Sequence, residues 1–130
     1  MAFSDIDAQT RTMIEADLAE AAGRGIGGTP ADVAGSFEAE LRNYLALPRD
    51  VQRSYPRGET ARVYGTALGE ALVREGFQWQ LLADDFGTDL VVVRDAGGPD
   101  EKYTAPLVVV DQRFEDDEPG KLTAFLGQFL

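Results

Sequence analysis

The chain lacks two of the residue types that carry much of enzyme chemistry, because none of its 130 residues is cysteine or histidine. Without cysteine there is no disulfide, no thiolate nucleophile and no cysteine-ligated metal. Without histidine, the commonest general acid–base group, the commonest zinc ligand and every serine–histidine triad are excluded too. We therefore expect no cofactor, no metal ligand set and no catalytic residue from this composition.

Serine and long apolar runs are also scarce. Serine occurs only at Ser4, Ser36 and Ser54, and none stands in a G-x-S-x-G or S-x-x-K motif. The longest apolar runs, at 90–93 and 105–110, are far too short to cross a bilayer. The first ten residues, MAFSDIDAQT, are acidic and have no apolar stretch, so we do not expect a signal peptide here. We therefore expect a cytoplasmic protein that does not enter a membrane.

Negative charge dominates, because the chain has 23 acidic and only 12 basic residues, which gives a formal net charge of −11. Nucleic acids and anionic membranes bind through lysine and arginine, so this balance disfavours both as partners. The simplest interpretation of the acidity is solubility. The alternative is a surface matched to a basic partner protein.

The first half of the chain shows helical patterns. Ser4 precedes the first, in a capping-box-like start. Thr29 and Pro30 predict the start of a second helix, and Pro48 ends it. A third helix is predicted over about 58–75, where the apolar residues again recur at helical spacing.

The second half begins with a period of two residues, which is typical of strands. Residues 77–94 predict a β-hairpin, with the turn chemistry of Asp and Gly at 84–87. A third strand is predicted at about 104–111, in a valine-rich segment. Asp116 or Asp117 then caps a final helix, and the acids at 115–118 complement the dipole of its first turn.

This element order predicts an α+β fold: three N-terminal helices, a three-stranded, mainly antiparallel sheet, and a C-terminal helix. Three strands are not stable alone in water, so we expect the helices to pack on one face of the sheet. A chain of this length fits a single domain over residues 1–130.

Gly65 and Gly69 lie one turn apart in the predicted third helix. Each costs about 1 kcal/mol relative to alanine, so a close neighbour is the expected reason. We predict that the only tryptophan, Trp79, is buried against this flat face.

The segment from Gly23 to Gly28 matches the dinucleotide-binding pattern G-x-G-x-x-G, but it follows a helix where the motif requires a strand. We therefore interpret it as a helix–helix linker. Anion binding at the start of the second helix, assisted by Arg24, is the alternative.

Four acids are the candidate binding residues. Asp84, Asp85 and Asp89 form the densest cluster near a strand, and Glu70 lies on the predicted third helix. Carboxylates in such a cluster could hold a divalent cation, but the spacing fits no complete calcium loop. A solvated hairpin turn is the simpler interpretation.

The block from Tyr64 to Val93 resembles a bacterial family, the domain of unknown function 3806. The similarity rests on a small-residue helix face, a tryptophan and a hairpin turn: Gly65, Leu68, Gly69, Glu70, Leu72, Trp79, Gly87, Asp89 and Leu90. It extends loosely to the C-terminus and is absent from residues 1–55. The resemblance supports the helix–hairpin arrangement and implies no activity, cofactor or catalytic residue.

These observations predict a small acidic bacterial domain that binds an unidentified, possibly basic, protein and is not an enzyme, in an immunity-like or chaperone-like role. The alternative is a carboxylate-based enzyme, or a small-ligand or metal binder, that uses Asp84, Asp85 and Asp89. We also expect a homodimer, because the strand at 104–111 would leave a sheet edge open to pairing.

Overall fold

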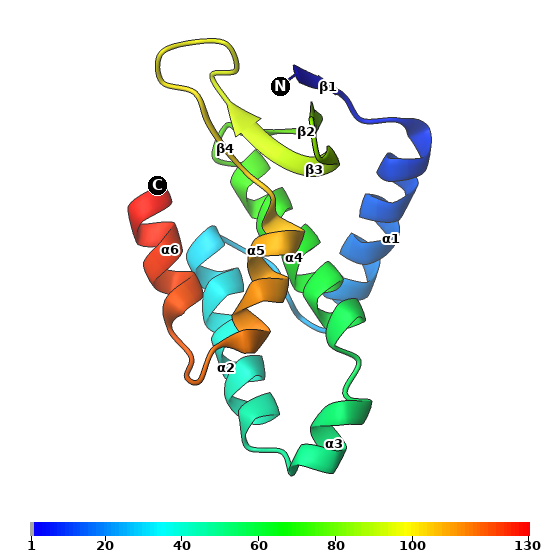
Figure 1. The fold of residues 1–130 in the computed structure, drawn as a ribbon, viewed down its shortest axis with the longest axis vertical. Helices are drawn as coiled ribbons and strands as arrows, with labels where there is room; N and C mark the ends of the chain where they lie inside the picture. The colour runs from blue at the N-terminus through cyan, green and yellow to red at the C-terminus, as the bar shows by residue number, and fades with distance from the viewer. Residues whose placement is uncertain (1) are drawn as a thin grey trace.

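The computed structural model describes residues 2–130, which form an α+β fold with six α-helices and a four-stranded antiparallel sheet (Figure 1). Figure 1 shows the sheet at one end of the molecule and α3 at the other. In chain order the elements are β1 Ala2–Asp5, α1 Ala8–Gly23, α2 Pro30–Leu45, α3 Arg49–Ser54, α4 Arg57–Val73, β2 Gln78–Asp84, β3 Gly87–Arg94, β4 Lys102–Thr104, α5 Pro106–Gln112, the 3₁₀ helix η1 Arg113–Glu115, and α6 Lys121–Phe129.

The predicted cap at Ser4 is wrong, because Ser4 belongs to strand β1. This strand pairs antiparallel with β2, with Ala2 opposite Ala83 and Ser4 opposite Leu81. Helix α1 begins later, where the side chain of Asp7 accepts a hydrogen bond of 2.7 Å from the backbone N–H of Thr10. The sheet therefore gains a fourth strand from the opposite end of the chain.

The second helix begins as predicted. Thr29 is the N-cap of α2, Pro30 occupies its first turn, and Thr29 and Asp32 form a reciprocal capping box. Pro48 does not simply end a helix. It precedes α3, a short helix that the sequence did not predict, so four helices lie between β1 and β2.

The predicted hairpin is confirmed, with β2 paired to β3 from Gln78 opposite Val93 to Asp84 opposite Gly87. The predicted third strand at 104–111 is wrong. Strand β4 covers only Lys102–Thr104, and the valine-rich segment forms α5. Pro106 stands at the start of α5, and the N–H of Val109 donates to the Ala105 carbonyl at 3.0 Å, so the backbone is already helical within the first turn.

The predicted start of the last helix is also wrong. Helix α6 begins at Lys121 after the N-cap Gly120, whose φ of 119° lies in the left-handed region that favours glycine. The acids at 115–118 therefore lie before α6 and do not form its first turn. Two of them make ion pairs: Glu115 with Arg57, and Asp116 with Arg113 and Lys121.

The main hydrophobic cluster lies between the helices and one face of the sheet. Trp79 pairs with Val92 in register, and both side chains join the cluster that α2, α4, α5 and α6 build. The Cβ that Gly69 lacks would overlap the Trp79 ring, which confirms the predicted contact, although the ring is only half-buried. Gly65 admits a different neighbour, Leu107 of α5.

Candidate functional site

The turn between β2 and β3 presents a large apolar side chain to solvent. Asp85 and Phe86 connect the two strands, and the Phe86 side chain is 99% exposed. The Asp84 carboxylate accepts a hydrogen bond of 2.8 Å from the Phe86 N–H, and Gly87 takes a φ of 134°. The turn is thus held by local hydrogen bonding and glycine chemistry, while its aromatic ring points away from the fold.

The hairpin acids flank this ring. Asp84, Asp85 and Asp89 are all exposed, as expected for a solvated turn. Asp89 lies opposite Leu82 in the sheet register, on the face that points away from Trp79. We name the segment 84–89 the hairpin tip.

The same face of the sheet carries a second apolar cluster. Leu82, Val91 and Val93 alternate with the residues that face the helices, yet they are 4%, 1% and 3% exposed. Phe3 lies opposite Leu82 and Tyr103 opposite Val93, and their rings meet edge-to-face with centroids 5.5 Å apart. Two edge strands therefore fold aromatic side chains over this side of the sheet.

Glu70 is not part of the hairpin tip. Its carboxylate accepts a hydrogen bond of 3.2 Å from Trp79 Nε1, which holds it beside the helix face of the sheet. It also lines a cavity of about 300 Å³ between α1 and α4, together with Arg74 and several apolar side chains. The four candidate acids thus divide between two places.

Within residues 2–130, no group of three or more aspartates and glutamates is close enough to hold a metal ion. Asp84, Asp85 and Asp89 therefore offer separate carboxylates and not a coordination shell.

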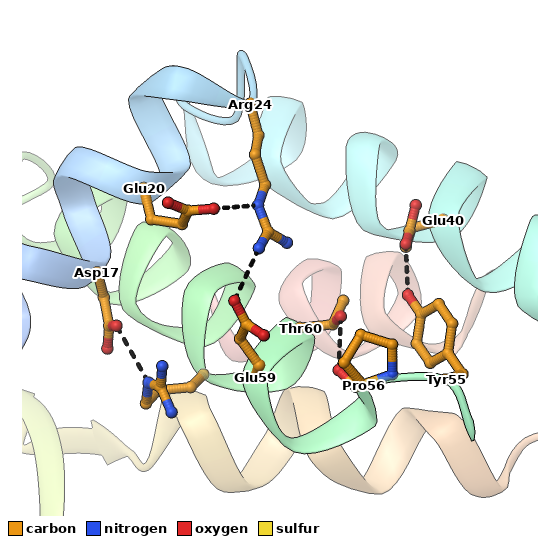
Figure 2. Close-up of polar contacts among 9 residues, drawn as sticks. Asp17, Glu20, Arg24, Glu40, Tyr55, Pro56, Glu59 and Thr60 are labelled. Carbon is orange, nitrogen blue, oxygen red and sulfur yellow. Dashed lines mark hydrogen bonds and ion pairs between the residues drawn. The ribbon is translucent and has the colours of Figure 1, made fainter. Parts of the chain in front are cut away.

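The glycine-rich segment at 23–28 connects α1 to α2, as predicted for a linker. The start of α2 already holds an anionic group of its own, since the Asp32 carboxylate accepts from the Thr29 N–H at 3.0 Å. Arg24 is engaged as well, with Nε 2.9 Å from Glu20 and Nη2 3.1 Å from Glu59 (Figure 2). The hydrogen bond that Arg24 donates to the Glu20 carboxylate raises the pKa of Arg24. These contacts leave the anion-binding interpretation without its two main donors.

The structure reveals polar contacts between helices that the sequence did not indicate. Asp17 of α1 is 5% exposed and accepts from Arg62 at 3.0 Å and from Thr66 at 3.3 Å. Figure 2 also shows the Tyr55 hydroxyl donating to the Glu40 carboxylate. Burial raises the pKa of Tyr55. These contacts link α1 to α4, and α2 to the residue that follows α3.

The residues that sequence reasoning missed are the aromatic ones. The pattern at 84–87 predicts only a turn at Phe86, although a phenylalanine between Asp85 and Gly87 is an unusual choice for a turn. Phe3 and Tyr103 could not be paired in advance, because β1 was not predicted and β4 was placed in the wrong segment. A large apolar residue in an otherwise polar turn was the available signal.

In the part of the chain that the structure describes, no helix is long and apolar enough to cross a membrane.

The helix–hairpin core and its flanking helices define a small α+β domain without a recognisable catalytic constellation among the described residues. The model of one family, described as a Domain of unknown function (DUF3806), matches residues 52–125. This match covers more than half of the chain, so the protein belongs to that family. It confirms the resemblance at Tyr64–Val93 and extends it from α3 into α6. Comparisons with curated proteins and with solved structures give no significant match.

Proposed function

We propose that this domain is a non-enzymatic protein-binding module, in an immunity-like or chaperone-like role, and that the hairpin tip engages a basic partner protein. The observation that carries the proposal is the 99% exposure of Phe86 between Asp84, Asp85 and Asp89. Aromatic side chains that insert into a partner's pocket supply much of the binding energy at protein interfaces. A fully exposed phenylalanine on a short, hydrogen-bonded turn has the form of such an anchor.

The acids around the ring define the chemistry of the partner. Carboxylates at the rim of an interface speed association with a basic surface and disfavour acidic ones. Asp89 extends the acidic rim onto the sheet face that points away from Trp79, since it lies opposite Leu82 in register. A partner pocket that accepts Phe86 is therefore expected to be apolar at its centre and ringed by lysine or arginine.

The alternative, a carboxylate-based enzyme or metal binder at the same acids, has less support. Paired carboxylates divide acid and base roles only when they share an environment that separates their pKa values. The hairpin acids stand in solvent, and Glu70 is hydrogen-bonded to Trp79. The geometry therefore favours recognition over catalysis at the hairpin.

Affinity capture from a lysate of the native host tests the proposal, with wild-type protein, Phe86→Ser and Val51→Ser as baits. Val51 of α3 is 44% exposed and serves as the matched control for loss of an exposed apolar side chain. We expect a basic protein that wild type and Val51→Ser retain and that Phe86→Ser loses. Equal capture by all three baits would refute the role of the hairpin tip, and repeated absence of a specific protein would refute the binding module.

A further inference from the structure

The cavity between α1 and α4 combines an apolar lining with two opposite charges. Its floor is formed by Leu18, Ala21, Ile26 and Ala67, of which the last three are 1%, 7% and 5% exposed. Its volume of about 300 Å³ lies at the lower end of the range of small-molecule sites in proteins. A ligand that fits here is small and presents an aliphatic group to the floor.

Two opposite charges stand at the cavity, at Glu70 and Arg74. They lie one turn apart on the same helical stretch, a spacing at which such residues commonly pair. Among the residues described, however, no ion pair joins them. Glu70 instead accepts from Trp79 Nε1 at 3.2 Å, and Arg74 Nη1 donates to the Gly28 carbonyl at 3.4 Å.

Each charged group is therefore oriented by a neighbour and keeps unused hydrogen-bonding capacity. The carboxylate has a second oxygen, and the guanidinium has further N–H donors. The carboxylate suits an ammonium group, and the guanidinium suits a carboxylate, with which it forms strong charge-assisted hydrogen bonds.

The geometry points to a binding site for a zwitterion with an aliphatic side chain, that is, a free apolar α-amino acid. Its ammonium group pairs with Glu70, its carboxylate pairs with Arg74, and its side chain lies on the floor of Ala21, Ile26 and Ala67. A metal ion is a poor occupant, because a single carboxylate supplies too few oxygen ligands. A phosphate-bearing ligand would leave both the apolar floor and Glu70 unsatisfied. The site uses residues outside the hairpin tip, and it stands or falls independently of the protein-binding proposal.

The probe is L-leucine, and its binding is measured by isothermal titration calorimetry and by the fluorescence emission of Trp79. Trp79 is the only tryptophan in the chain and is hydrogen-bonded to Glu70. We expect saturable binding. The analogues 3-methylbutylamine and 4-methylpentanoate each lack one of the two charges, and each should bind roughly tenfold more weakly or worse.

Variants test the two charged residues. Glu70→Gln keeps an oxygen that can accept from Trp79 but removes the charge, and Arg74→Gln changes an exposed side chain, so both should fold. Each should weaken L-leucine binding roughly tenfold or more. Glu75→Gln, an exposed carboxylate that does not line the cavity, should bind as wild type. Absence of saturable binding to wild type, unchanged binding by Glu70→Gln and Arg74→Gln, or an amine that binds as well as L-leucine would each overturn the inference.

Discussion

At the scale of single residues, two glycines of α4 each allow a different element to approach. A Cβ at Gly65 would lie 2.5 Å from the Leu107 Cα, so this glycine lets the backbone of α5 pack directly on α4. A Cβ at Gly69 would overlap the Trp79 ring, whose Nε1 is held by Glu70 one residue along. The sequence indicated a close neighbour at both positions but assigned both to Trp79.

Substitutions at these glycines should therefore be costly. We predict that Gly65→Ala and Gly69→Leu each lower the free energy of unfolding by about 1–3 kcal/mol through overpacking. Gly35→Ala is the control, because an added Cβ there meets nothing within 4 Å, and it should stabilise α2 by about 0.5–1 kcal/mol. Urea unfolding measures all three, and a Gly69→Leu protein as stable as wild type would show that the Trp79 contact is not close.

Tyr55 gives a prediction that depends on pH. Burial, together with its hydrogen bond to Glu40, raises the pKa of Tyr55 above its usual value of 10.0. Above that pH the unfolded chain loses the phenol proton while the folded protein keeps it, so stability falls as pH rises. Tyr55→Phe removes this titration, and its free energy of unfolding should fall less steeply with pH above about 10. Parallel alkaline slopes for the two proteins, measured by urea unfolding, would contradict the effect.

At the scale of elements, the sequence predicts a helix or strand correctly where several signals within one short segment agree. The hairpin was predicted because its two-residue period and its Asp and Gly turn lie within one short segment. The start of α2 was predicted because Thr29 and Pro30 act within one helical turn. Strand β1 was not predicted, because Phe3 is the only large apolar residue in its four positions and its partner strand lies more than seventy residues away.

The segment that forms α5 shows tertiary packing overriding propensity. Its three consecutive valines favour a strand, yet Pro106, Val110 and Phe114 are buried at a spacing of four residues, which is helical. The flat surface at Gly65 supplies a place for this helix to dock. No property of residues 104–111 alone carries that information.

The placement of Glu70 away from the hairpin acids likewise depends on packing between α4 and Trp79 and not on any local sequence pattern.

Two valines distinguish the helix from the predicted strand. Val108 is 47% exposed and Val110 is fully buried. We predict that Val110→Ala costs about 2 kcal/mol and Val108→Ala less than about 1 kcal/mol. In a strand the two side chains would lie on the same face, and the two substitutions would lower the free energy of unfolding by similar amounts. Thermal and urea unfolding of the two variants measure this difference, and equal losses would contradict the helical packing.

At the scale of the whole molecule, the expected homodimer remains a proposal on a different basis. The predicted strand at 104–111 motivated the dimer, but most of this segment forms helix α5. The edges of the sheet are instead β1 and the three-residue β4. We predict that two copies associate through β1, and that added salt strengthens the association by screening the net charge of −11. Light scattering over a concentration series measures the mass. A mass of one chain at high protein concentration and moderate salt would rule the dimer out.

The most direct test of the central claim is a titration of the captured partner against wild type, Phe86→Ser and Val51→Ser at several salt concentrations. If the hairpin tip binds the partner through Phe86 and an acidic rim, Phe86→Ser should lose affinity about tenfold or more, and Val51→Ser should lose none. Association with wild type should also slow as salt rises. Wild-type affinity in Phe86→Ser, or association that salt does not change, would contradict this role of the hairpin tip.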